Sequence, residues 1–301
     1  MQPRQQLRTL TTVRSPEILV RVGAGAGSSF GLVLASLVAF TACPADPGAL
    51  AVREADRLYR EQRWEDAAIA YSTLPESSGD WQGYGAWRAG VIFRDPMGNP
   101  RRATNQFTLC AREYESGSTW GYTCLVELGD LARDSANPRA AIDAYRKALE
   151  LLPTGQWSEH CLLESGRSYQ EIGEYEQSRK EWIELLSRFA RSTRAPEVML
   201  GIARSFDLQG KGKDAQRAFR EVHQTYPKHS VAPLAIFGEA EVLEQMGELE
   251  AALKLYEEVK LKHPNPQVVL QKMEALKERQ QRRDVDTGAG EVRDSGRKYR
   301  R

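Results

Sequence analysis

The sequence predicts an all-α protein, a right-handed superhelical solenoid of about six helix pairs followed by a C-terminal capping helix. Two observations lead to this prediction. Apolar residues recur with helical spacing through most of the chain, and one short motif returns about every 37 residues. In addition, no apolar and polar residues alternate with a period of two after residue 48, so strands are not expected.

Composition sets broad limits on function. The chain has 301 residues, of which 41% are apolar and 28% charged, as in an ordinary globular protein. Its 42 lysines and arginines balance 41 aspartates and glutamates. Because no strong net field attracts polyanions, we expect no nucleic-acid partner.

Residues 1–43 are expected to form an export signal. Four arginines between residues 4 and 21 precede an uncharged stretch, and its densest apolar part, residues 30–40, is shorter than the ~20 residues of a membrane-spanning helix. The letters "FTAC" that end at Cys43 resemble the bacterial lipobox, in which the cysteine is acylated and becomes the first residue. The resemblance implies a lipid on Cys43 and a short tether over residues 44–50.

Other interpretations of this segment are a cleaved signal without lipid, an uncleaved anchor, or a buried Cys43. The stretch "ILVRVGAGAGSSFGLVLA" also looks like the strand, glycine-rich turn and helix of a dinucleotide-binding fingerprint. That fold needs further strands alternating with helices. Since none are predicted downstream, we reject it.

Residues 51–264 are predicted to hold the six repeats. Each motif has a small residue and, four positions later, an aromatic residue, which share one face of a helix. The small residues are Ala67, Ala103, Ala141, Ser178, Ala215 and Ala252, and the aromatic residues are Tyr71, Phe107, Tyr145, Trp182, Phe219 and Tyr256. The small residue is expected where a partner helix approaches closely, with the aromatic ring filling the space beside it.

An upstream helix completes each pair and, in the later repeats, ends near a glycine that permits a left-handed cap, as at Gly173, Gly210 and Gly247. Together these features resemble the tetratricopeptide repeat. A period near 37 with "YP" at a repeat end is similar to envelope proteins such as the β-barrel assembly lipoprotein and the Tol-Pal coordinator family. The resemblance implies a solenoid that binds protein partners.

The end of the solenoid needs a cover. Residues 265–282 are predicted to form an amphipathic capping helix with Val268, Leu270, Met273 and Leu276 facing the last repeat. Residues 283–301 have few apolar side chains and are predicted to be a disordered basic tail.

The resemblance implies that the first helices line a concave groove. Aligned repeats place one apolar residue per repeat at an inward position, which predicts a strip that binds a helix or an extended segment of an envelope protein. The strip consists of Val126, Leu163, Leu200 and Phe237. In the alternative interpretation this position packs between neighbouring helices.

Cytoplasmic co-chaperone members of the family hold a C-terminal carboxylate through lysine and asparagine at positions five and nine of the first helices. In this chain the fifth positions are apolar and the ninth include Arg167 and Arg204, which we include among the candidate groove residues. The carboxylate clamp of those members is therefore not expected.

Two cysteines are predicted to face each other. Cys110 and Cys124 each lie seven residues from Gly117, at which an antiparallel helix pair would turn. An oxidising periplasm would permit a disulfide, and two buried thiols are the alternative. Cys161 has no evident mate.

Nothing in the sequence predicts catalysis. The four histidines lack the spacing of metal ligands, no CxxC pair occurs, and "GKGKD" lacks the pattern of a phosphate-binding loop. We therefore expect a non-enzyme that has no cofactor and no metal.

The leading hypothesis is a lipid-anchored periplasmic scaffold that assembles or positions outer-membrane, pilus or secretin, motility or cell-wall machinery. Pro44 rather than aspartate follows Cys43, which favours the outer membrane, facing the periplasm. The alternatives are a non-catalytic recruiter of a peptidoglycan enzyme and a soluble cytoplasmic adaptor.

Overall fold

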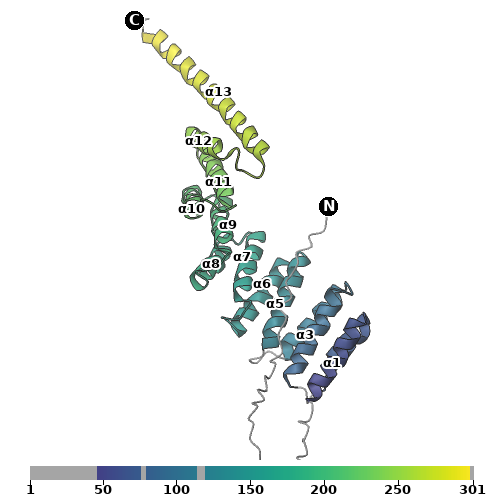
Figure 1. Ribbon diagram of the computed structural model, residues 1–301. Helices are drawn as coiled ribbons and strands as arrows, with labels where there is room; N and C mark the ends of the chain where they lie inside the picture. The colour runs from purple at the N-terminus through teal and green to yellow at the C-terminus, as the bar shows by residue number, and fades with distance from the viewer. Residues whose placement is uncertain (1–45, 76–78, 114–118, 299–301) are drawn as a thin grey trace, which may run out of the picture. The chain divides into compact units, whose positions relative to one another are not determined.

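The computed structural model describes residues 46–75, 79–113 and 119–298, and the side-chain surroundings of these residues up to 283 except at Glu113. Cys43, the predicted export signal and the first tether residues lie outside these ranges. Within them the structure has thirteen helices and no strand (Figure 1). The predicted all-α helical-repeat solenoid is confirmed.

Twelve helices form six consecutive pairs, and a thirteenth follows them. The pairs are α1 (Pro47–Arg60) with α2 (Trp64–Ser72), α3 (Asp80–Arg94) with α4 (Pro100–Glu113), α5 (Thr119–Asp134) with α6 (Pro138–Leu151), α7 (Ser158–Glu171) with α8 (Tyr175–Arg188), α9 (Ala195–Leu208) with α10 (Gly212–Thr225), and α11 (Ala232–Gln245) with α12 (Leu249–Val259). Helix α13 spans Pro266–Lys298. Each helix packs mainly against the helices before and after it in the chain.

The first helix begins earlier than expected, within the segment predicted to be a tether. The Asp46 carboxylate accepts a hydrogen bond of 2.9 Å from the backbone N–H of Gly48, and Pro47 occupies the first helical turn. Both are strong start signals, because an aspartate cap satisfies a free N–H and proline has a fixed helical φ. Only the residues before Pro47 can therefore serve as a tether.

A single left-handed residue lies in the turn between the two helices of every pair, five residues before the buried small residue. It is Gly98, Gly173, Gly210 and Gly247 in four repeats, but Gln62 (φ 60°) and Ala136 (φ 53°) in the first and third. Glycine adopts this conformation without the steric cost that a Cβ brings.

The motif positions form the core. All six small residues are fully buried, and none of the six aromatic side chains is more than 2% exposed. In several pairs the ring lies on a glycine of the first helix. A Cβ on Gly129 would come within 2.3 Å of the Tyr145 ring, and one on Gly166 within 2.2 Å of Trp182. These positions keep the paired helices close, as the repeat motif predicts.

The start of α13 packs on the last pair, through a face that differs from the predicted one. Val269, Met273 and Leu276 are buried, whereas Leu270 is exposed and Val268 only half-buried. Spacings of four and three place the buried residues on one side of a helix, while Leu270 points elsewhere.

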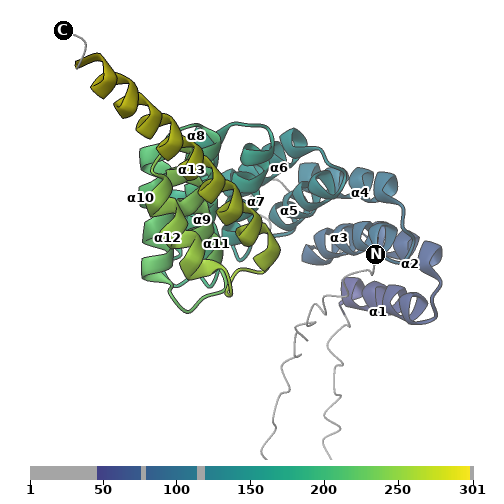
Figure 2. The ribbon, with the colours of Figure 1, turned by 90° about the horizontal axis from the view of Figure 1, so that it is seen from above.

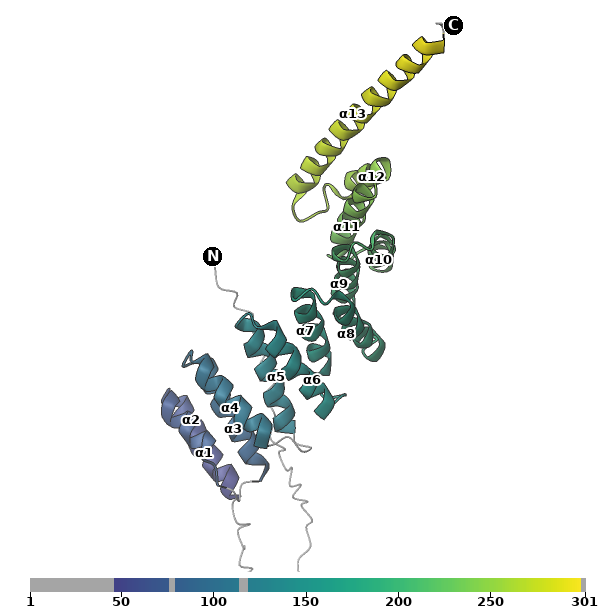
Figure 3. The same ribbon diagram turned by 180° about the vertical axis from the view of Figure 1, so that it is seen from behind.

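The predicted disorder of residues 283–301 is wrong up to Lys298, because α13 continues that far. In Figures 1, 2 and 3 its later turns extend beyond α12. Once the first turns are fixed against α12, each further residue adds a hydrogen bond without a new nucleation cost. The amino-acid composition, on which the prediction of disorder rests, does not reflect this stabilisation by a preceding helical turn.

Candidate partner-binding surface

The predicted apolar strip is not an open groove. Val126, Leu163 and Leu200 are each 4% exposed and belong to the core, so the prediction is wrong for these three residues. The Trp182 ring explains part of this burial: its Nε1–H donates to the backbone oxygen of Leu163 at 3.2 Å. The alternative interpretation, packing between neighbouring helices, describes the position better.

The fourth strip residue differs from the others. Phe237 is half-buried, and its ring lies 5.5 Å from that of Tyr256 and 4.7 Å from that of His263. The equivalent residue of the second repeat is Trp87, which is also half-buried. A side chain at this position therefore reaches the surface only when it is a large aromatic.

The two predicted groove arginines have different surroundings. Arg167 lies 2.7 Å from Glu164 and 3.6 Å from Glu197, and burial lowers its pKa. It therefore joins carboxylates of its own and the next repeat. Arg204 is exposed on α9. The structure does not bring these arginines together with an open apolar strip.

An aromatic surface lies on the first helices of the second and third repeats. It consists of Trp81, Tyr84 and Trp87 from α3 and Trp120 from α5, all half-buried. The Tyr84 ring is 5.8 Å from Trp81, 6.0 Å from Trp87 and 5.4 Å from Trp120. Trp87 and Trp120 stack at 5.8 Å. Spacings of three residues place the α3 rings on one side of that helix.

Neighbouring residues fix these rings. The Trp81 indole N–H donates to Asp46 at 2.8 Å, and that of Trp87 donates to Glu127 at 3.1 Å. A Cβ on Gly83 would come within 2.5 Å of the Trp120 ring, so glycine makes room for it. Sequence reasoning missed this surface, although "WQGYGAW" shows three aromatics at spacing three, because the predicted strip includes residues of the last four repeats only.

Charged residues join the first helices of successive repeats. Positions in each first helix are numbered so that the buried glycine or alanine in its middle, such as Gly90 or Gly129, is position eight. With this numbering, position twelve of one repeat faces position six of the next. Arg94 pairs in this way with Glu127, and Arg133 with Glu164. The side chains of both glutamates are largely buried, at 15% and 8% exposure. These pairs link the second, third and fourth repeats.

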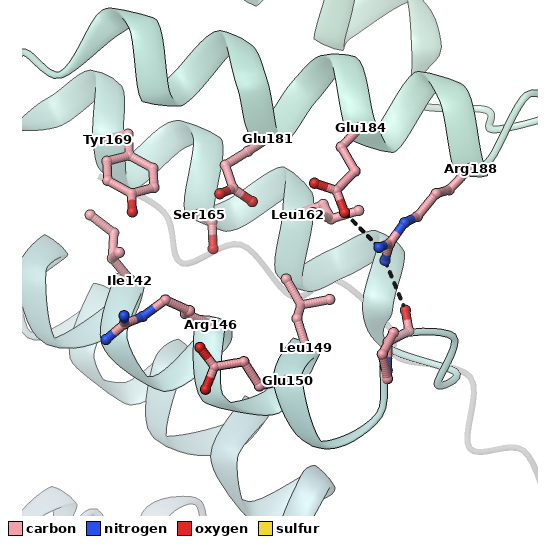
Figure 4. A pocket seen from close by; sticks show the side chains of 11 residues that line it. Ile142, Arg146, Leu149, Glu150, Leu162, Ser165, Tyr169, Glu181, Glu184 and Arg188 are labelled. Atoms are coloured by element: carbon pink, nitrogen blue, oxygen red, sulfur yellow. Dashed lines mark hydrogen bonds and ion pairs between the residues drawn. The ribbon is translucent and has the colours of Figure 1, made fainter.

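A cleft of about 200 Å³ lies between α6, α7 and α8 (Figure 4). Leu149 and Leu162 line it together with Glu181, Glu184 and Arg188. Burial, and then the neighbouring charge of Glu184, raise the pKa of Glu181 to about 7, against the opposing charge of Arg188.

Arg188 is committed to contacts beside this cleft. Its guanidinium lies 2.7 Å from Glu184 and donates to the backbone oxygen of Pro153 at 3.1 Å. The cleft thus has an acidic group whose charge changes near neutral pH.

The sulfur atoms of Cys110 and Cys124 form a disulfide between α4 and α5 in the structure, with their Cα atoms 6.1 Å apart. The state of this pair in the exported protein stays a prediction. Cys161 is free and buried, and burial, followed by the charge of Asp130, raises its thiol pKa to about 12.

Polar clusters on the first helices have structural partners. Asp130 accepts hydrogen bonds from Tyr145 Oη at 2.7 Å and lies 2.6 Å from His160 Nε2. Over the part of the chain that the structure describes, no three acidic, histidine or cysteine residues are grouped as metal ligands. No described helix is long and apolar enough to cross a membrane.

Comparisons with known proteins agree with this fold. Two tetratricopeptide-repeat family models match, one at residues 122–154 and one at residues 208–275. No curated protein sequence matches the chain.

Solved structures with similar folds have low sequence identity. A tetratricopeptide repeat protein from Parabacteroides merdae ATCC 43184 aligns with TM-score 0.51 and 16% identity, over 82% of this chain and 93% of its own. The complex of Naa15/Naa10 bound to HypK-THB aligns with TM-score 0.53 and 16% identity, over 79% and 35%. The type IV pilus biogenesis factor PilW aligns with TM-score 0.48 and 15% identity, over 74% and 98%.

These likenesses concern the fold. The chain contains tetratricopeptide repeats stacked as an all-α solenoid, a scaffold type of fold that binds protein partners. Folds of this type are typically non-catalytic.

Proposed function

We propose that the chain is a lipid-anchored periplasmic scaffold that binds a protein partner and thereby assembles or positions a complex of the bacterial cell envelope. The aromatic surface carries this proposal. Tryptophan and tyrosine are enriched where proteins bind one another, because each offers a large, rigid apolar area. Four such side chains from two helices remain half-open to solvent.

The export pattern of residues 1–43 and the lipobox-like "FTAC" support the location. The facing positions of Cys110 and Cys124 are a second, independent support, because structural disulfides are typical of oxidising compartments such as the periplasm. Pro44 after the cysteine favours the outer membrane.

Partner capture tests the proposed binding surface. Cells that express the protein are crosslinked, the complexes are purified, and the partners are identified by mass spectrometry. Tyr84→Ala combined with Trp87→Leu should remove the principal partner. The control is Ile183→Ser, which alters an exposed apolar residue on α8.

Both variants must melt within a few degrees of the parent for the comparison to hold. Full capture by the double variant would place the interface elsewhere. Recovery of a murein enzyme as the principal partner would favour the recruiter of a cell-wall enzyme.

Membrane fractionation tests the anchor separately. Two or more acyl chains hold a protein stably on a membrane, whereas a single short chain does not. Cys43→Ser should therefore move the protein from the membrane pellet to the soluble fraction and abolish palmitate labelling. Equal pelleting and equal labelling of the variant would contradict the lipid anchor, and a parent chain extracted without detergent would favour the cytoplasmic adaptor.

A further inference from the structure

We propose that Arg88, beside the aromatic surface, binds a carboxylate of an extended protein segment in which an aromatic side chain lies next to that carboxylate. The inference deepens the proposed function, since it names the chemistry that the partner brings to this surface. It does not depend on the lipid anchor or on the compartment.

Aromatic rings surround Arg88, but no anion does. Its guanidinium carbon lies 4.8 Å from the ring centre of Tyr59, 5.4 Å from that of Tyr71 and 6.0 Å from that of Trp87. The Nε–H is buried without a hydrogen-bond partner. Among the ion pairs of the described residues none involves Arg88, and the nearby Asp56 instead accepts a hydrogen bond from the Tyr71 hydroxyl.

The repeat itself shows what is missing at this position. In the next two contacts, position twelve is an arginine and position six a glutamate, as in Arg94 with Glu127 and Arg133 with Glu164. Between the first and second repeats, position twelve is Tyr59 and position six is Arg88. The chain thus places a cation where it elsewhere places a carboxylate, and supplies aromatic rings and the neutral Tyr71 hydroxyl to it, but no carboxylate.

Arginine in this environment is suited to a carboxylate from outside. A cation–π contact offsets only part of the cost of removing a cation from water. The planar guanidinium fork matches a carboxylate with two parallel hydrogen bonds. Arg88 is half-buried rather than buried, so it remains accessible.

The aromatic surface defines the rest of the partner segment. Trp87 is both a ring under Arg88 and a member of that surface, so a carboxylate on Arg88 brings neighbouring side chains onto Tyr84 and Trp120. A flanking phenylalanine would find aromatic edges and faces there. The site differs from the carboxylate clamp of co-chaperones, because Arg88 is at position six rather than five or nine.

Three peptides test the inference on the full purified chain. Ac-Ala-Phe-Glu-Phe-Ala-NH2 carries a side-chain carboxylate, Ac-Ala-Phe-Gln-Phe-Ala-NH2 carries none, and Ac-Ala-Phe-Gln-Phe-Ala-OH carries only a terminal carboxylate. Affinity is measured from tryptophan fluorescence and from the NMR shift of the Arg88 Nε–H. At least one carboxylate peptide should bind about tenfold more tightly than the neutral one, and which one shows the source of the carboxylate.

Arg88→Met removes the charge and keeps a long side chain among the rings. It should abolish the discrimination between carboxylate and neutral peptides, while the melting temperature stays the same or rises, because an unpaired half-buried cation is lost. The matched control is Arg53→Met, the exposed position-six residue of the first repeat, which should keep the discrimination.

Equal affinity for the three peptides, unchanged discrimination in Arg88→Met, or no saturable binding up to about 1 mM would overturn the inference. If Arg88→Met fails to fold, Arg88→Lys decides. Lysine keeps the charge but not the fork, so an unchanged affinity for the carboxylate peptide would also overturn it. Because no membrane or envelope partner enters these measurements, their failure is distinct from failure of partner capture.

Discussion

The first helices are joined differently in the two halves of the solenoid. In the third and fourth repeats position six is Glu127 or Glu164, and each pairs with an arginine of the preceding repeat. In the fifth and sixth repeats the same position is Gly201 or Gly238. There the aromatic ring of the preceding second helix fills the space: a Cβ on Gly201 would lie 2.8 Å from Trp182, and one on Gly238 2.6 Å from Phe219.

From the third repeat onward, position six thus serves either charge pairing or close aromatic packing. The charged contact depends on two residues from different repeats, whereas the packed contact depends on the absence of a side chain. The charged contact is therefore sensitive to the loss of a side chain, and the packed contact to the addition of one.

Removing one member of a charged contact should give the largest effect. Arg133→Met leaves Glu164, whose side chain is 8% exposed, with Arg167 as its remaining cation. Loss of one partner of a buried pair costs about 3 kcal/mol in the free energy of unfolding, which urea unfolding would measure. Adding Glu164→Leu should restore most of that loss, because no buried charge then remains. A double variant that is less stable than Arg133→Met would contradict this explanation.

Loss of the Cys110–Cys124 disulfide should destabilise the half of the solenoid that contains the Arg–Glu contacts. Its closed loop has a sequence separation of 14, for which the chain-entropy model gives about 3 kcal/mol. Cys110→Ala with Cys124→Ala should lower stability by up to that amount. Thiol counting on the exported, denatured and unreduced protein checks the bond itself, and three free thiols would rule it out.

The packed half should respond to a single added side chain. Gly238→Val places new atoms against the Phe219 ring and should destabilise the protein by about 1–3 kcal/mol. Combining Gly238→Val with Phe219→Leu should recover part of the lost stability, because the Phe219 ring is what the new side chain would contact. Arg204→Val, at an exposed site on α9, is the control and should change little.

The motif positions could be predicted from the sequence because each meets its partner within one helix pair, at fixed spacing. Ala215 and Phe219, for example, are both buried as expected. The spacing of small and aromatic residues contains that information without reference to any other part of the chain.

The binding surface could not be predicted in the same way. Whether Leu200 is open or buried depends on how closely the neighbouring repeat approaches, and that depends on side chains such as Trp182 beside Gly201. Trp87 and Trp120 stack across two repeats, so a search within each repeat did not reveal the aromatic surface. Arg88 lacks a carboxylate partner at a position where two later repeats have Arg–Glu pairs, and no single repeat contains that information.

The pH dependence of stability should distinguish Glu239 from Glu181, because the pKa values of these two glutamates are shifted in opposite directions. Burial pushes the pKa of Glu239 upward, but hydrogen bonds from His223 and Arg220 outweigh burial, and the net effect is a lowered pKa. A lowered pKa stabilises the fold above the unfolded value of the acid, and this stabilisation is lost as the pH falls.

Glu181 has the reverse sign. Its pKa is raised to about 7, so the folded state holds the proton more tightly, and stability falls as the pH rises from the unfolded value toward 7. Thermal unfolding across this range should show the stability of Glu181→Gln increasing relative to that of the parent as the pH rises. The stability of Glu239→Gln relative to the parent should be lowest at neutral pH. Parallel curves for both variants would contradict these assignments.

The smallest effect concerns the turns that end the first helices. Ala136 adopts a left-handed φ of 53° at the position where Gly173 adopts 79° in the next repeat. A Cβ in this conformation costs about 1 kcal/mol. Glycine avoids this cost, but part of the gain is offset because glycine loses more conformational freedom on folding. Ala136→Gly should therefore raise the free energy of unfolding by roughly 0.5 kcal/mol, and Gly173→Ala should lower it by a similar amount. The two turns lie in different helix pairs, Ala136 between α5 and α6 and Gly173 between α7 and α8, so their effects should add within error in the double variant. A destabilised Ala136→Gly would show that the cost of the left-handed alanine is offset by contacts of its methyl group.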